Sequence, residues 1–127
     1  MSQFNKDVLD YLQNSKMMRK SFESNYGIDL TVTPERAKFT YRMIVNKRKA
    51  GAIVSSTAHD FILDIKPAGD LYIRVTIFDW FTGNTVYQNK LYCPDKQHIR
   101  QIVNTGEYIC KLRCIAVHQM GMLNEMA

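Results

Sequence analysis

Hydrophobic and polar residues alternate in two runs between residues 70 and 93, and a short turn separates the runs. This alternation predicts two paired β-strands, because successive side chains of a strand point to opposite faces. With a three-residue loop over 82–84, in which Asn84 takes the left-handed conformation, Phe81 pairs with Thr85. The aliphatic face of this hairpin is the predicted core. It collects Ile73, Val75, Ile77, Tyr87, Leu91 and Cys93, with Asp79 and Asn89 as polar exceptions.

The rest of the chain supplies further elements around this hairpin. Apolar residues recur near helical spacing from about Ser2 to Phe22, which predicts an N-terminal helix over 2–22 with Ser2 as a cap. Residues 59–66 alternate as a strand, and Pro94 opens a helix that Gly106 ends. The alternation over 108–117 predicts a closing strand, and 120–127 form a short tail without a pattern.

Two interpretations remain open for residues 34–50. Thr33 followed by Pro34 is a typical helix start and Gly51 is a plausible end, so the favoured prediction is a helix. The alternative is a strand, because apolar and polar side chains also alternate from Phe39 to Val45. In that case 46–51 form a basic hairpin loop and the residues after Gly51 form the return strand.

These elements together predict a single α+β domain over residues 1–127. Its antiparallel sheet has about four strands, with the sheet core in 58–93 and helices packed on one face. Hydrophobic residues make up 46% of the chain and charged residues 23%, which is ordinary for a globular protein. The sequence has no secretory signal and no apolar run long enough to cross a bilayer. With three cysteines, which cannot all pair within one chain, these features predict a cytoplasmic protein that contacts no membrane.

The net charge of +5 is concentrated in one segment. Basic and acidic side chains balance in residues 1–30 and again in 51–127, so the excess lies between Thr31 and Ala50. Such localisation predicts a positive surface patch that attracts polyanions or acidic protein surfaces. The cations of this segment, which oppose only Glu35, are Arg36, Lys38, Arg42, Lys47, Arg48 and Lys49.

Nucleic-acid binding is the specific function that these features favour. The second face of the hairpin carries aromatic and basic side chains that could stack unpaired bases, while the Lys47–Lys49 cluster holds phosphates. This model requires the two surfaces to lie close together in the fold. Whether the partner is DNA or RNA stays open. The candidate residues on the hairpin are Tyr72, Arg74, Phe78, Trp80, Lys90 and Tyr92.

Catalytic and metal-binding chemistry have weaker support. Cys110, Cys114 and His118 are spaced by four residues, with Cys93 and His98 upstream, but the predicted strand favours buried thiols over a zinc site. The 64–66 segment matches the D-x-K element of some metal-dependent nucleases, with Asp60 on the same side of the strand, yet a solvated strand face explains it better. We therefore predict a non-enzymatic protein without a metal or other cofactor.

The alternative function is a protein-interaction module. A small domain with seven tyrosines, seven methionines and an aromatic sheet face could inhibit a larger enzyme, form a homo-oligomer or join an assembly without touching nucleic acid. Association that is insensitive to salt would favour this alternative, whereas strongly salt-dependent binding of DNA or RNA would favour the first.

Overall fold

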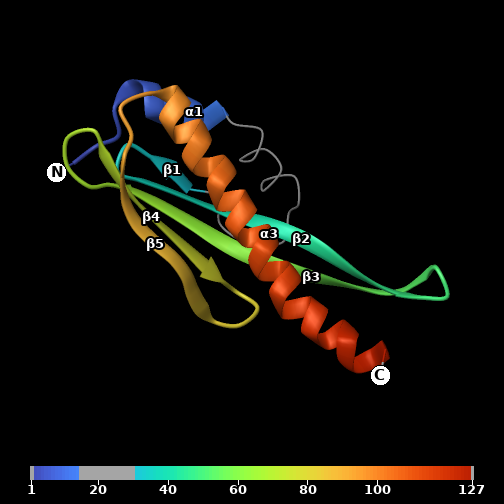
Figure 1. Cartoon of the computed structure of the whole chain (residues 1–127). Helices are drawn as coiled ribbons and strands as arrows, with labels where there is room; N and C mark the ends of the chain where they lie inside the picture. Colours follow the sequence, from blue (N-terminus) through green and yellow to red (C-terminus); the bar gives the residue numbers. More distant parts are fainter. Residues whose placement is uncertain (1, 15–30, 127) are drawn as a thin grey trace.

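Among the described residues, five antiparallel strands form one open sheet, and two helices lie against it (Figure 1). The computed structural model describes residues 2–14 and 31–126, with side chains described as far as His118. The strands follow one another in the sheet in chain order, so every neighbour pair is a hairpin. The described elements are α1 (Lys6–Asn14), β1 (Thr31–Thr33), β2 (Arg36–Lys49), β3 (Ala52–Pro67), β4 (Tyr72–Asp79), β5 (Asn84–Tyr92) and α3 (Lys96–Met126).

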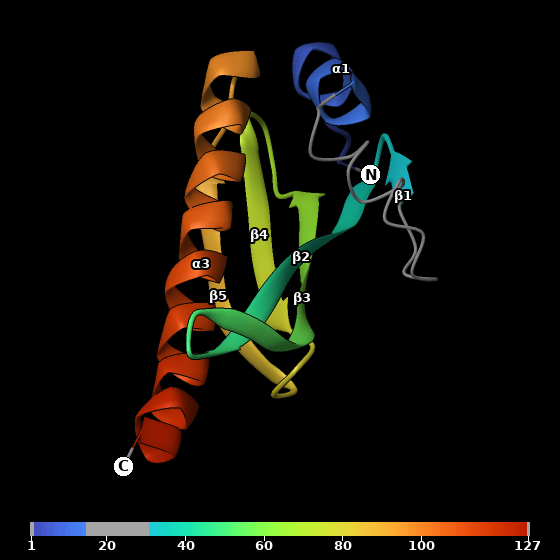
Figure 2. The same cartoon turned by 90° about the vertical axis from the view of Figure 1, so that its right-hand side faces the viewer.

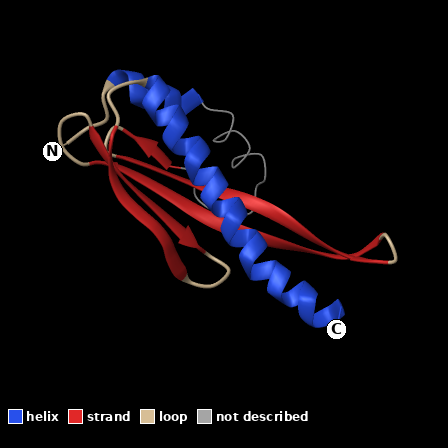
Figure 3. Ribbon diagram, viewed as in Figure 1, coloured by secondary structure: helices blue, strands red, loops and turns tan. Residues whose placement is uncertain are grey.

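The architecture is α+β, as the sequence predicts, but the sheet has five strands rather than about four. Figures 2 and 3 show α3 running along the sheet, and residues of α1, α3 and the inward sheet face share one core. Within the described residues, no helix is long and apolar enough to cross a membrane. The largest fully buried apolar side chains of the core are Leu12, Phe39, Phe61, Leu63, Ile65, Ile77 and Ile99.

The favoured helix over 34–50 is wrong, because this segment is strand β2 and its long hairpin with β3. Lys49 pairs with Ala52, so Ala50 and Gly51 form a two-residue turn, with φ of 53° and 83°. Positive φ at both positions matches the tight turns that follow the natural twist of a hairpin. The strand and return strand of the alternative interpretation were therefore correct, but its loop over 46–51 was too long, because residues 46–49 still pair with β3.

The closing strand over 108–117 is also wrong, because α3 continues without a break from Lys96 to Met126 and includes most of the expected tail. Gly106 lies inside this helix instead of ending it. A Cβ atom there would lie 3.0 Å from Cδ2 of Leu63 and 3.7 Å from Cδ1 of Ile77. The glycine thus lets the helix approach the sheet closely. In the sequence alone, a glycine with this packing role cannot be distinguished from one that ends a helix.

The β4–β5 hairpin confirms the predicted faces but not the predicted register. From Tyr72 to Ile77, which pair with Tyr92 to Tyr87, the ladder is shifted by two residues from the predicted one, and a bulge after Ile77 shifts the last two pairs by one more. A shift of two residues keeps each side chain on its face, which is why the face assignment survives. The bend of the loop falls on Gly83, with φ of 79°, instead of Asn84.

Helices α1 and α3 both begin at side-chain caps. Asn5 Oδ1 accepts the Val8 amide at 2.9 Å, so α1 begins at Lys6 and not at the predicted Ser2. Asp95 Oδ1 accepts the His98 amide at 3.0 Å and starts α3. Each is the usual capping geometry, in which a side-chain oxygen satisfies an amide without a helical partner. The part of the predicted first helix after Asn14 lies outside the described residues.

Candidate functional site

Strands β2 and β3 extend well beyond the rest of the sheet (Figure 1). Pairing between β3 and β4 begins only at Phe61, opposite Asp79, whereas β3 itself begins at Ala52. At about 3.3 Å per residue, the part of β3 that precedes Phe61 and does not pair with β4 is roughly 30 Å long. We call residues 44–58 the arm. Every residue of β3 within the arm, from Ala52 to Ala58, is exposed.

The end of the arm carries the densest positive charge among the described residues. The last three residues of β2 are Lys47, Arg48 and Lys49, and all three are exposed. Arg48 Nη1 donates a hydrogen bond to the carbonyl oxygen of Gly51 at 3.3 Å, which holds the guanidinium beside the turn. We call these three residues the arm tip. Like charges gathered at such a projecting position raise the local positive potential, which attracts polyanions.

Two other cations of the same segment do not contribute to that charge. Arg36 forms a two-pronged ion pair with Asp64, with Nε–Oδ1 and Nη2–Oδ2 distances of 3.0 and 2.7 Å, and Arg42 does the same with Asp60. The six cations are therefore not one patch. The pairs also occupy the two carboxylates of the possible nuclease motif, which leaves them poorly placed to converge on a metal ion.

The aromatic face lies on the side of the sheet opposite the core. Tyr72 and Tyr92 pair across β4 and β5 with ring centroids 5.5 Å apart, and Lys90 Nζ lies 5.2 Å from the Tyr72 ring centre. Trp80 is 61% exposed and contacts the half-buried Phe78 edge to face at 6.1 Å. Arg74, opposite Lys90, is exposed too. The sequence thus grouped these six side chains correctly.

The arm tip and the aromatic face are not neighbours. Arg48 pairs with Ile53 at one end of β3, while Arg74 pairs with Lys66 near the other end. At about 3.3 Å per residue the two places are roughly 40 Å apart along the strand. The model in which bases stack on the tyrosines while the arm tip holds their phosphates requires proximity, so we do not carry it forward.

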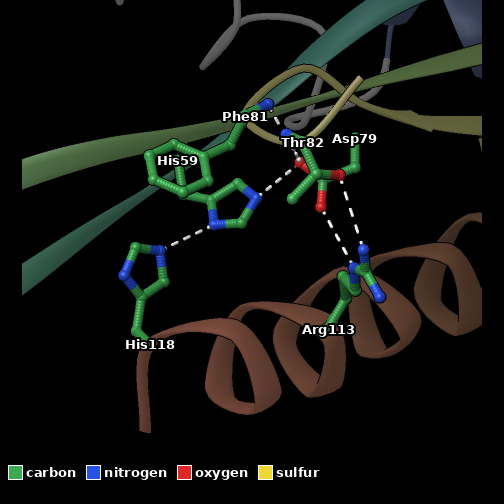
Figure 4. Close-up of polar contacts among 6 residues, drawn as sticks. All are labelled: His59, Asp79, Phe81, Thr82, Arg113 and His118. Atoms are coloured by element: carbon green, nitrogen blue, oxygen red, sulfur yellow. Dashed lines mark hydrogen bonds and ion pairs between the residues drawn. The ribbon is translucent and has the colours of Figure 1, made fainter. Parts of the chain in front are cut away.

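A buried polar cluster joins the base of the arm to α3 (Figure 4). His59 is fully buried, and its two ring nitrogens lie 2.7 Å from Asp79 Oδ1 and 2.8 Å from His118 Nε2. Asp79 Oδ1 also accepts the amides of Phe81 and Thr82, at 2.9 and 3.2 Å. Arg113 Nε donates to Asp79 Oδ2 at 3.1 Å. Both ring nitrogens of His59 and both carboxylate oxygens of Asp79 therefore have partners, as buried polar groups require.

Burial and neighbouring groups shift the pKa values of Asp79, His118 and Cys114. Burial opposes the charge on Asp79, but hydrogen bonds from His59, Arg113 and the Thr82 amide outweigh it and lower the pKa of the carboxyl group. Burial and the neighbouring His59 lower the pKa of His118, which favours the neutral ring. Burial, with the charge of Asp79, raises the pKa of the Cys114 thiol. A protonated, buried thiol is a poor nucleophile, so this geometry does not support cysteine catalysis.

The cysteine and histidine positions differ from the sequence interpretation. Cys110, Cys114 and His118 lie on successive turns of a helix, and only Cys114 and His118 join a group of converging ligand atoms. Their third member is His59, which sequence reasoning missed. Cys93 is buried elsewhere, and His98 bonds Asp95. His59 lies two residues before the inward-facing Phe61, so the alternation of the strand places its side chain on the buried face. This alternation is the sequence signal that could have identified it.

Comparisons with known proteins identify no relative: no family model, no curated protein and no solved structure matches this chain.

Proposed function

We propose that the protein binds nucleic acid through the arm, with Lys47, Arg48 and Lys49 contacting phosphates. The observation that carries the proposal is the position of three exposed cations at the end of a two-stranded ribbon that projects from the folded body. Contacts of this kind release condensed counterions and supply most of the affinity in non-specific binding. The protein acts by binding and catalyses no reaction.

Duplex DNA is the form of nucleic acid that best suits this shape. The major groove of B-form DNA admits a two-stranded β-ribbon, whereas that of an A-form RNA helix is too deep and narrow for side chains to read. The arm is a ribbon of this type, with a two-residue turn that keeps its end slender. Exposed Ile53 and Val54 flank the charged end and provide apolar contact surface.

Fluorescence anisotropy with short labelled nucleic acids tests this proposal. At low salt we expect duplex DNA to bind with a Kd on the order of 10⁻⁶ M or tighter, and duplex RNA and single strands to bind more weakly. A variant with Lys47→Gln, Arg48→Gln and Lys49→Gln should lose at least about tenfold in affinity, because three phosphate contacts disappear.

A charge-matched control separates the arm tip from the net charge. Lys6→Gln, Arg100→Gln and Lys111→Gln also remove two lysines and one arginine from exposed positions, but on the two helices. We expect this control to bind almost like the wild type. Equal losses in both triple variants, or no detectable binding of any nucleic acid by the wild type, would remove the proposal.

The second candidate is a protein-interaction module that docks onto another copy of itself. Tyr108, Leu112 and Ile115 are 61%, 49% and 48% exposed and share one face of α3 at helical spacing. Two such stripes could pack antiparallel across a twofold axis. Light scattering that finds a salt-insensitive dimer, lost on Leu112→Glu, would favour this candidate.

The proposed compartment is the cytoplasm. Cys93, Cys110 and Cys114 are all free and buried, and they behave as small apolar core residues. Free thiols of this kind are typical of a reducing environment.

A further inference from the structure

Three potential metal ligands converge where the base of the arm meets α3. A ring nitrogen of His59, the sulfur of Cys114 and a ring nitrogen of His118 all lie within 4.8 Å of one another. His59 comes from β3, while Cys114 and His118 are one helical turn apart on α3. Residues four apart on a helix share a face, so the helix presents both of its ligands to the strand.

The orientation of His59 leaves the correct nitrogen available. Asp79 can only accept hydrogen bonds when ionised, so the His59 Nε2 atom at 2.7 Å carries the proton. The Nδ1 atom then has a free electron pair, which points at His118 Nε2 at 2.8 Å. In the metal-free protein His118 donates its own N–H to that pair. A metal ion would take an electron pair from each ring, so the proton on His118 Nε2 would move to Nδ1 or to solvent, and the Cys114 thiol would release its proton to solvent as the sulfur binds.

We propose that His59 Nδ1, Cys114 Sγ and His118 Nε2 bind one zinc ion, with a water molecule as the fourth ligand. Two imidazoles and a thiolate are the nitrogen and sulfur donors that zinc prefers. At Zn–N distances of about 2.0–2.1 Å and tetrahedral angles, the two ring nitrogens need a separation of roughly 3.3 Å. The present 2.8 Å between these two nitrogens therefore has to widen by only about 0.5 Å to admit the ion.

The surroundings of the three ligands suit a metal centre. The contact from Asp79 to His59 is the carboxylate–histidine arrangement that fixes the ring of a metal ligand and raises its basicity. Arg113 contacts the other oxygen of Asp79, and Figure 4 shows it on the far side of the carboxylate from His118. The Phe61 ring stacks on His59 at 4.5 Å, and the Phe81 ring lies 5.2 Å from His118. Aromatic rings thus shield the ligands, while half-buried His118 leaves access for water.

Metal binding at this place would fasten the arm to the helix. His59 pairs with Met43 immediately next to the first residue pair of the arm, Ile44 and Ala58. A bond through the ion would link this base to Cys114 and His118 of α3, in addition to the existing contact between the two rings. The ion would consequently stabilise the folded chain and fix the direction in which the arm leaves the body.

The test is a titration of the full chain, without a histidine tag and cleared of metal by a chelator, against zinc and against cobalt(II) as a spectroscopic probe. We expect one equivalent of each to bind, with the thiolate-to-cobalt charge-transfer absorption of a bound cysteine and the visible bands of a tetrahedral site. Cys114→Ala should abolish the charge-transfer band. His118→Ala should weaken zinc binding by more than the roughly 10–100-fold that changes around a metal site usually cost.

Cys110→Ala is the matched control, because Cys110 is a buried cysteine one turn earlier on the same helix and outside the ligand group. This variant should bind zinc and show the cobalt spectrum of the wild type. Zinc should also raise the Tm of the wild type and of Cys110→Ala but not of Cys114→Ala. The proposal is wrong if the wild type binds less than stoichiometric metal, if cobalt shows no thiolate absorption, or if both cysteine variants lose binding equally. If Cys114→Ala fails to fold, the His118→Ala variant still tests the proposal, because His118 is only half-buried and its truncation removes less of the core.

Discussion

Strands β2 and β3 run through both the arm and the body of the protein, by which we mean the described residues outside the arm. In the body, Phe39 of β2 and Phe61 and Leu63 of β3 are buried under the helices. In the arm, residues 52–58 of β3 are all exposed, and the end of β2 carries three cations. Backbone pairing continues through both parts, apart from a register shift between Lys47 and Arg48.

This difference separates stability from function along a single hairpin. Burial of apolar side chains supplies most of the folding free energy, so the body determines whether the chain folds. The arm makes no comparable core, and its sequence is free to serve a partner. Changes in the body should therefore alter the free energy of unfolding, while changes at the arm tip should alter binding alone.

The largest expected effect is a truncation in the body. Phe61→Ala should lower the free energy of unfolding by about 3–5 kcal/mol, because it removes a fully buried ring and leaves a cavity beside His59. Denaturant titration followed by circular dichroism measures this loss. The arm control is Ile53→Ala, at a position 52% exposed, which should change stability by less than about 0.5 kcal/mol. Similar losses for both variants would contradict the division between body and arm.

Gly106 gives an intermediate effect at the contact between helix and sheet. Gly106→Val should cost about 1–3 kcal/mol of stability, since the new side chain has to push Leu63 away from a Cβ position only 3.0 Å from it. Thermal unfolding can compare it with Ala116→Val, an exposed position on the same helix. If Gly106→Val is no less stable than that control, the close approach of α3 to the sheet is not important for packing.

The turn of the arm offers a smaller, stabilising change. Ala50 has φ of 53°, a conformation that costs an alanine roughly 1 kcal/mol and that asparagine tolerates better. Ala50→Asn creates the Asn-Gly pair that favours such turns. Amide hydrogen exchange in the arm should slow by up to about fivefold, for a gain near 1 kcal/mol, while exchange in β4 stays the same. Faster exchange at Lys49 and Ala52 would show that the turn is not built as described.

The aromatic face should have the smallest effect on duplex binding. Tyr92→Ala, at a position 49% exposed, removes a ring roughly 50 Å along the sheet from the arm tip and should leave the affinity for duplex DNA within twofold of the wild type. Anisotropy measurements with duplex and single-stranded DNA check this. A large loss of affinity for either form of DNA would support the model in which bases stack on the aromatic face.

Much of the body could be predicted from the sequence, because burial imposes a period on it. The alternation of Ile73, Val75 and Ile77 fixed the core face of β4, and it did so even though the pairing with β5 was displaced by two residues. The helical interpretation of 34–50 and the strand over 108–117 failed for a related reason. In each segment apolar residues fit both periods, and tertiary contacts decided between them.

The candidate sites depended on partners that lie far apart in the chain. Arg36 and Arg42 look like part of a basic patch until Asp64 and Asp60 come to lie beside them in β3. The convergence of His59 with Cys114 and His118 likewise requires α3 to cross the base of the arm, and no local sequence pattern predicts this crossing. The arm tip could be recognised directly, since its three consecutive cations remain exposed in either interpretation of 34–50.

The salt dependence of duplex DNA binding tests the central claim most directly. The slope of log Kobs against log salt counts the phosphate contacts, at about 0.9 per contact on B-form DNA. Replacing Lys47, Arg48 and Lys49 with glutamine should reduce the magnitude of the slope by about 2.7, while the charge-matched control on the helices keeps the wild-type slope. A slope unchanged by the arm-tip substitutions would show that the arm does not hold the nucleic acid.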